Sequence, residues 1–346
     1  MIKKIDSSGN VKKLSLWRLL IVLVVIVSFS SLIFTSQKQW RASQAAQSIE
    51  PWFASYVDVT ATPTFAFEQM GTTVSTRNAV LSFIVASPKD PCTPSWGDSY
   101  TLDDAAAYLD LDRRIARLQQ QGGSIAVSFG GLLNDELAVV CEDKDKLTRA
   151  YEDVISRYDV DTIDLDLEGD GLTNIEAGKR RAESLAELQN KQREDNKSLA
   201  VWVTLPVTAQ GLNEDGTNAI SILLDNGVDI AGVNIMTMNF GESKNDMDMY
   251  DASVNSLNET KRQLKILYQK AGIELSDATL WKKIGATPMI GQNDVKDEVF
   301  EVKDAKNLNS FGKSQGLGRM SMWSANRDRM CGGNYTDTNV VSDSCS

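Results

Sequence analysis

Short apolar, β-branched runs alternate along the chain with longer segments that have apolar positions at helical spacing. The pattern starts near Pro51 and continues toward the C-terminus. The short runs predict eight strands, at 53–60, 79–87, 122–130, 162–168, 199–206, 229–238, 282–290 and 318–325. The clearest helical segments between them are 103–121, 143–158, 174–195, 214–226, 252–271 and 303–314.

Eight strands in alternation with helices predict a single (β/α)8 barrel, the TIM-barrel fold. An open, doubly wound α/β sheet is the alternative. That fold would need a glycine-rich dinucleotide-binding turn after the first strand, and the sequence has none there. The barrel is therefore the favoured architecture.

An uncharged apolar run at residues 19–34 follows a basic segment, residues 1–18. It predicts either a signal anchor over 19–35, with residues 1–18 in the cytoplasm, or a signal peptide that is cleaved near the small residues 42–46. The anchor is favoured because 18 residues is long for the basic part of a cleaved signal. In both interpretations residues 36–50 are a polar linker, and the domain at 51–346 lies outside the cytoplasm, at the cell surface or secreted.

All four cysteines lie in the part of the chain predicted to be exported. An even number of cysteines outside the cytoplasm predicts two disulfides. We expect Cys331–Cys345, which closes a tail rich in Gly, Asn, Ser and Asp, and by elimination Cys92–Cys141. No Cys-x-x-Cys spacing occurs, so the cysteines do not indicate a zinc site.

Charge and composition exclude several classes of function. The formal net charge is −11, and the chain beyond the basic segment carries −15. Such an acidic body argues against a nucleic-acid partner, because affinity there comes from Lys and Arg on phosphates. The chain has no histidine, which excludes Ser-His-Asp and Cys-His catalysis and His-bound zinc. Acid–base chemistry must then come mainly from carboxylates, and no metal or cofactor is expected.

Three carboxylates fall on one face of the fourth predicted strand, because side chains alternate along a strand. They are Asp164, Asp166 and Glu168, and the apolar residues between them share the other face. A half-exposed strand with its polar side in water is the alternative, but the fourth of eight barrel strands is buried on both faces. Carboxylates stacked in a barrel interior raise at least one pKa, which provides the protonated group that a general acid needs.

With these residues the sequence resembles glycoside hydrolase family 18, the chitinase family. The family signature D-x-x-D-x-D-x-E is matched by Asp161, Asp164, Asp166 and Glu168, and the S-x-G-G motif of the third strand is matched at 128–131. A tryptophan on the eighth strand corresponds to Trp323. The segments CTPSWGD, TLPVTAQGL, TPMIGQNDV and WSANRDR resemble a bacterial chitinase branch, and the similarity runs from about Pro51 to the end.

The resemblance implies a retaining, substrate-assisted hydrolysis of β-1,4-linked N-acetylglucosamine polymers such as chitin. Glu168 would protonate the glycosidic oxygen while the acetamido carbonyl of the substrate attacks the anomeric carbon. Asp166 would hold the acetamido N–H, and Asp164 behind it would share its proton and tune both pKa values. Water would then open the intermediate with Glu168 as the base. The mechanism needs no second carboxylate across the bond as a nucleophile.

One part of the sequence departs from the family pattern. The sixth strand of the family usually ends in M-x-Y-D, and here the matching residues are Met236-Thr237-Met238-Asn239. Met238 cannot donate a hydrogen bond to the acetamido carbonyl, and Asn239 lacks the charge of Asp. The loss of one donor to developing charge costs about 10²–10³ in rate, so the departure indicates low activity rather than a different acid.

Further residues are candidates for sugar binding or for support of the acids. Stacking of pyranose faces on aromatic rings makes Trp323 the first candidate, followed by Trp96 in a loop after the second strand and Tyr56 with Asp58 on the first. The residues after the seventh strand, Gln292, Asn293 and Asp294, would bind hydroxyl groups. Residues expected to support the acid cluster are Ser128, Gly130, Gly131 and Asp161.

Two other functions remain open. The same fold and acid would serve an endo-β-N-acetylglucosaminidase that cuts N-glycans. A weakly active or non-catalytic sugar-binding barrel is the other alternative, which Asn239 supports and the presence of Glu168 opposes. The expected partner in each case is an oligo- or polysaccharide containing N-acetylglucosamine, with a monomeric protein and membrane contact only through an uncleaved N-terminal helix.

Overall fold

The computed structural model describes residues 17–28, 50–70, 77–333 and 340–346. The chain divides into two units, Met1–Gln44 and Ala45–Ser346. In the first unit residues 17–28 are helical. Over the described ranges, no helix has both the length and the apolar character that a bilayer crossing requires. The rest of the predicted anchor, residues 29–35, and the linker up to residue 49 lie outside the described residues.

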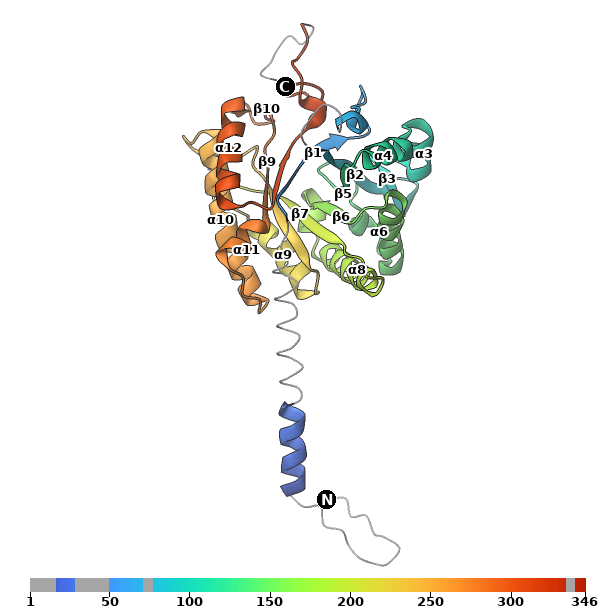
Figure 1. Cartoon of the computed structure of the whole chain (residues 1–346), viewed down its shortest axis with the longest axis vertical. Coiled ribbons are helices and arrows are strands. Elements are labelled where there is room, and N and C mark those ends of the chain that lie inside the picture. Colours follow the sequence, from blue (N-terminus) through green and yellow to red (C-terminus); the bar gives the residue numbers. More distant parts are fainter. Residues whose placement is uncertain (1–16, 29–49, 71–76, 334–339) are drawn as a thin grey trace, which may run out of the picture. The chain divides into compact units, whose positions relative to one another are not determined.

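Parallel strands of the second unit close into a barrel (Figure 1). Each neighbouring pair is in parallel register, and the first strand pairs with both the second and the last, which closes the ring. All eight predicted strands are confirmed, with ends shifted by a few residues. They are β1 (Trp52–Asp58), β2 (Asn78–Ser87), β5 (Ser124–Gly130), β6 (Thr162–Asp166), β7 (Ala200–Pro206), β8 (Ile230–Met236), β9 (Ile284–Thr287) and β12 (Arg319–Met322).

Helices surround the barrel, and several begin at a side chain that accepts a hydrogen bond from a first-turn N–H. Asp143, Asn174, Asn213 and Asp248 are such caps. The predicted helix at 103–121 is two helices, because Asp110 between them has a left-handed φ of 54°. The helices are α3 (Leu102–Tyr108), α4 (Leu111–Gln120), α5 (Leu137–Val140), α6 (Lys144–Tyr158), α7 (Gly169–Thr173), α8 (Ile175–Glu194), α9 (Glu214–Asp225), α10 (Met249–Lys270), α11 (Asp277–Lys282) and α12 (Val302–Gln315).

An antiparallel extension of the sheet was not predicted. Strand β3 (Asp90–Trp96) folds back on β2, and β4 (Tyr100–Thr101) pairs with β3. A small hairpin of β10 (Gly291–Gln292) and β11 (Val299–Phe300) follows β9.

The extension formed by β3 and β4 changes the interpretation of Trp96, the last residue of β3. Trp96 is fully buried and donates from Nε1 to the Tyr158 hydroxyl at 2.9 Å. The prediction that Trp96 is an outer sugar subsite is therefore wrong, since the ring packs against α6.

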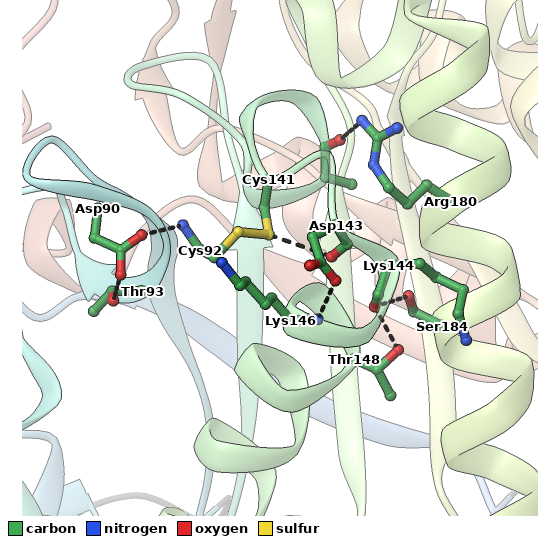
Figure 2. The surroundings of a disulfide bond; sticks show 11 residues. Asp90, Cys92, Thr93, Cys141, Asp143, Lys144, Lys146, Thr148, Arg180 and Ser184 are labelled. Carbon is green, nitrogen blue, oxygen red and sulfur yellow. Dashed lines mark hydrogen bonds between the residues drawn. A yellow bond between two sulfur atoms is a disulfide. The ribbon is translucent and has the colours of Figure 1, made fainter.

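Both predicted disulfides are present. Cys92–Cys141 joins β3 to the end of α5 across 49 residues of sequence (Figure 2). Cys331–Cys345 closes the C-terminal tail. Arg327, which is buried, donates to the carbonyls of Ile290, Gln292 and Ser342, so the tail is fastened to the loop that follows β9.

Candidate active site

Strand β6 separates its side chains as the alternation predicts. Its apolar residues face the helices and are buried, whereas Asp164 and Asp166 point into the barrel at 0% and 5% exposure. The strand ends at Asp166, so Glu168 stands just beyond it as the residue before α7, half-buried at the mouth of the barrel. The three carboxylates therefore lie at successive depths below the opening, as the spacing predicted.

A pocket of about 560 Å³ opens above the carboxyl ends of the strands, the position at which TIM barrels place their sites. The structure brings eight of the sequence-predicted candidates into its wall. They are Tyr56, Asp58, Asp166, Glu168, Met238, Asn239, Asp294 and Trp323. Other lining residues were not predicted, among them Phe83, Thr204, Thr287 and Asp343.

Burial raises the pKa of two of the acids that line the pocket, Asp166 and Glu168. The pKa of Asp166 lies well above the ordinary value, first because the group is desolvated and then because Glu168 and Asp164 are close. The pKa of Glu168 is also raised, by burial first and then by the negative charge of Asp294. A raised pKa at the mouth of a pocket shifts Glu168 toward the protonated state that a general acid requires.

Aromatic rings form one side of the pocket. Trp323 and Phe83 stack with centroids 5.6 Å apart and an interplanar angle of 21°. Tyr56 lies 6.0 Å from Trp323 at a tilt of 57°. Because Trp323 is only half-buried, part of its ring is available to the apolar face of a sugar.

The glycines of the S-x-G-G motif allow the chain to pass close to β6 and the aromatic wall. A Cβ on Gly130, whose φ is +100°, would lie 2.2 Å from the carbonyl oxygen of Asp166. A Cβ on Gly131 would lie 3.2 Å from the Phe83 ring. A side chain at Gly130 would push the acid strand away from β5, and one at Gly131 would crowd the Phe83 ring, which explains why glycine is needed at both positions.

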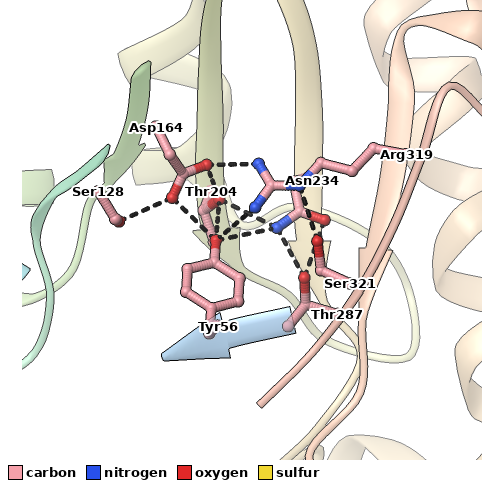
Figure 3. A network of polar contacts seen from close by, with 8 residues as sticks. All are labelled: Tyr56, Ser128, Asp164, Thr204, Asn234, Thr287, Arg319 and Ser321. Atoms are coloured by element: carbon pink, nitrogen blue, oxygen red, sulfur yellow. Dashed lines mark hydrogen bonds and ion pairs between the residues drawn. The ribbon is translucent and has the colours of Figure 1, made fainter. Parts of the chain in front are cut away.

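Asp164 is the centre of a buried polar network under the pocket (Figure 3). One carboxylate oxygen accepts from Thr204 Oγ1 at 2.7 Å and Arg319 at 2.5 Å. The other accepts from the Tyr56 hydroxyl and Ser128 Oγ, both at 2.8 Å. Asn234 extends the network to Thr204 and Thr287. Ser128 thus supports the acid cluster, as predicted.

Two other predicted roles are corrected by the structure. Gln292 is buried outside the lining, and its amide donates to the backbone carbonyls of Asn293, Val295 and Glu298, so it shapes a loop. Asp161 is exposed at the start of β6 and accepts from the Thr162 hydroxyl, so it does not touch the acid cluster.

The residues that depart from the family pattern both line the pocket. Met238 is buried and apolar. Asn239 has a left-handed φ of 51°, and its side-chain oxygen accepts from the backbone N–H groups of Asp294 and Val295. Its Nδ2 donates to Asp294 Oδ2 at 2.7 Å. Asn239 therefore holds the loop that carries Asp294.

Three residues of the site have roles that the sequence did not reveal. Arg319 is the lone charged residue of the predicted strand 318–325, a signal that could have indicated a buried carboxylate partner. Asp294 is a candidate for hydroxyl binding in the sequence, and in the structure its charge also raises the pKa of Glu168. Asp343 reaches the pocket through the folding of the tail, which no local pattern reveals.

Removal of the charge of Asp294 is expected to lower the pKa of Glu168. A general acid must be protonated, so activity declines as pH rises through that pKa. In Asp294→Asn the alkaline limb of the kcat/KM profile should therefore move to lower pH, while the amide oxygen can still accept from Asn239. The control is Asp297→Asn, which removes an exposed charge from the same loop outside the lining. An unchanged limb in Asp294→Asn would contradict the assignment.

No group of three or more His, Cys, Asp and Glu side chains within the described ranges could hold a metal ion. The side chains that line the pocket offer carboxylate acid–base chemistry, together with stacking and hydrogen bonding of a ligand.

Comparison with known proteins found curated relatives. The chain is 31% identical over 291 residues to the "probable bifunctional chitinase/lysozyme" of Escherichia coli (strain K12), a match that covers 82% of this chain and 32% of that protein. It is 31% identical over 283 residues to "endochitinase 11" of Metarhizium anisopliae, covering 80% and 52%. The chain thus spans about a third and about half of these relatives. No family model matches it.

Solved structures have the same barrel. The catalytic domain of the hyperthermophilic chitinase from Pyrococcus furiosus is 27% identical, with a TM-score of 0.71 over 84% of this chain and 89% of that chain. The GH18 chitinase from Pseudoalteromonas aurantia shares the fold at 17% identity, with a TM-score of 0.51 over 79% and 93%.

Proposed function

The chain belongs to glycoside hydrolase family 18, and we propose that it hydrolyses β-1,4 linkages between N-acetylglucosamine units with Glu168 as the general acid and base. The observation that carries the proposal is the position of Glu168, half-buried at the pocket mouth with a raised pKa, directly above Asp166 and near the aromatic wall.

The residues divide the work of a substrate-assisted reaction. Glu168 protonates the leaving oxygen, and the acetamido oxygen of the substrate attacks the anomeric carbon as that bond breaks. Asp166 Oδ1 is buried, has no hydrogen-bond partner among the described residues and belongs to a lining residue, so it is suited to accept the acetamido N–H. A buried acceptor that has no donor in the free protein contributes more binding free energy, when the substrate donates to it, than an acceptor that already has a donor. Water then attacks the anomeric carbon, the bond from that carbon to the acetamido oxygen breaks, and Glu168 takes a proton from the water.

The charge of the pocket favours a neutral chitin chain over an anionic polymer. Its described lining residues include five carboxylates, Asp58, Asp166, Glu168, Asp294 and Asp343, and no lysine or arginine. One of the relatives is named a chitinase/lysozyme, but in peptidoglycan every second sugar has a lactyl group that carries an acidic peptide. Like charges in a pocket cost binding free energy, so chitin is the better fit.

Two substrates separate this function from its alternatives. The purified protein should cleave chitohexaose and release products whose new reducing end is first the β anomer, measured by proton NMR. Cellohexaose has a hydroxyl in place of the acetamido group, so it should stay intact. An α anomer first, or equal cleavage of both substrates, would refute substrate assistance. Binding of chitohexaose without any product would favour a sugar-binding barrel.

We also propose that the barrel works outside the cytoplasm. Two disulfides join described cysteines, and such bonds persist in oxidising compartments. An extracellular site fits a polymer that is too large to enter a cell.

A further inference from the structure

The helix that follows Glu168 is too short to be stable by itself. Helix α7 has five residues, Gly169–Thr173, and Glu168 is the residue directly before it. Isolated helices of fewer than about 12–15 residues are marginal in water. The N–H of Leu172 donates to the carbonyl oxygen of Glu168 at 3.2 Å, so the backbone of Glu168 follows any movement of α7. Contacts with other elements must therefore fix α7, and with it the acid.

Arg181, from α8, makes such a contact. Its side chain is 2% exposed, and its Nη2 donates to the carbonyl oxygen of Gly171, in the middle of α7, at 2.8 Å. The same nitrogen donates to Glu136 Oε2 at 2.9 Å, and Nε donates to Glu136 Oε1 at 3.3 Å. A guanidinium that a carboxylate holds at two points has a defined orientation. Arg181 is therefore a fixed donor directed at α7.

The partner of Arg181 is itself fixed by the outer elements of the barrel. Glu136 Oε1 accepts from the Tyr151 hydroxyl of α6 at 3.3 Å, and Oε2 accepts from the backbone N–H of Val139 in α5 at 3.2 Å. The side chain of Glu136 is 5% exposed, so little water competes for these bonds. The ion pair therefore connects α5, α6 and α8 to the backbone of α7.

The stem of Glu136 also contacts the chain on both sides of the acids. A Cβ on Gly130, in the S-x-G-G turn, would lie 3.5 Å from Glu136 Cγ, and a Cβ on Gly171 would lie 3.4 Å from it. The turn is joined to the end of β6, because the N–H of Gly131 donates to the carbonyl oxygen of Asp166 at 2.9 Å. Neither Glu136 nor Arg181 lines the pocket. The pair thus supports the segment that carries the acids without reaching the substrate.

We propose that Arg181 is a positioning residue, which holds α7 through the carbonyl of Gly171 and so sets the position of the Glu168 carboxyl group at the pocket mouth. The proposal rests on the proposed function, because it takes Glu168 as the acid. A displacement of about 1 Å at a reacting group costs about 10²-fold in rate, so a bond behind the acid controls kcat without touching the sugar. If the pair served stability alone, activity would instead follow stability in every variant.

The double variant Arg181→Met/Glu136→Met, made in the full chain, separates the two roles. Two apolar side chains can replace a buried ion pair, so the urea midpoint should stay close to that of the wild type. No donor then remains for the carbonyl of Gly171. We expect kcat on chitohexaose to fall about 10–10²-fold with little change in KM, because the aromatic wall is intact. A stable double variant with wild-type kcat would overturn the proposal.

Glu136→Gln is the opposite case. Its amide oxygen can still accept from Arg181, which keeps its bond to Gly171, but the buried guanidinium loses its balancing charge. The urea midpoint should therefore fall while kcat stays near the wild-type value. A kcat as low as that of the double variant would contradict the proposal, and if Glu136→Gln does not fold, the double variant decides.

The matched control is Arg180→Met. Arg180 is the neighbouring arginine of α8, and its Nη2 donates to the carbonyl of Ala138 in α5 (Figure 2). Its removal also breaks a contact between α8 and another element, but it leaves the bond to α7 in place. The kcat of this variant should equal that of the wild type. A loss as large as in the double variant would show that the effect is not specific to Arg181.

Hydrogen exchange measured by mass spectrometry gives a readout that does not need turnover. The amides of Leu172 and Asn174 donate to the carbonyls of Glu168 and Asp170. They should exchange faster in the double variant, because α7 opens more often, and at the wild-type rate in Arg180→Met. This result would stand even if the protein cleaved no chitin, so failure of the proposed function and failure of the Arg181 assignment can be told apart. Unchanged exchange in the double variant would refute the assignment.

Discussion

Replacement of Glu168 by glutamine is expected to lower kcat on chito-oligosaccharides by about 10²–10⁴-fold, the usual contribution of a positioned acid or base. Glutamine keeps the shape of the side chain but has no proton to give to the leaving oxygen. The affinity for chitohexaose should be preserved, because the aromatic wall and Asp166 are untouched. Rates come from product release followed by mass spectrometry, and affinity comes from calorimetry.

The matched control for Glu168 is Asp170→Asn. Asp170 is an exposed carboxylate two residues further along, in α7, and is not a lining residue. Its loss should leave kcat within twofold or so of the wild type, since surface substitutions have small effects. A folded Glu168→Gln protein with more than about a tenth of wild-type kcat would show that another group is the acid.

Replacement of Arg181 by methionine is expected to lower the free energy of unfolding by about 3–5 kcal/mol. Arg181 donates to Glu136 Oε2 at 2.9 Å, and the two side chains are 2% and 5% exposed. Its Nη2 also donates to the carbonyl of Gly171, in the short helix after Glu168. Without Arg181 the carboxylate of Glu136 is buried with only Tyr151 and the first turn of α5 as donors.

Urea unfolding at pH 7 measures the loss. Arg113→Met is the control because it breaks an ion pair whose side chains are 81% and 43% exposed, and the urea midpoint should not change. The double variant Arg181→Met/Glu136→Met should recover most of the lost stability, since two apolar side chains can replace a buried pair. A single Arg181→Met variant as stable as the control would refute the importance of the pair.

The barrel could be predicted because most of its strands are short apolar runs that alternate with helices. Strand β3 was not predicted because it contains Pro91 and Pro94, and proline argues against a strand. The two prolines can be accommodated because β3 is an antiparallel extension beside β2 and not a strand of the barrel. The order of the acids on β6 was predictable because the alternation of side chains on a strand has a strict period of two.

Other parts of the site depend on partners that are distant in sequence. Trp96 gave the same local signal as a sugar-binding tryptophan, but its partner Tyr158 lies 62 residues further along the chain. Arg319 meets Asp164 across the barrel, 155 residues away. Closure of the barrel, rather than any local pattern, creates such pairs, so the buried partners of Asp164 could be identified only from the structure.

The fastening of the C-terminal tail links maturation to the shape of the pocket. Cys331–Cys345 closes the tail, Arg327 and Arg329 bind its carbonyls, and Asp343 within it forms part of the wall. A newly made chain with free thiols lacks this closure. We therefore expect this part of the pocket wall to form only when the two thiols are oxidised. A recombinant preparation from a reducing host should lack it.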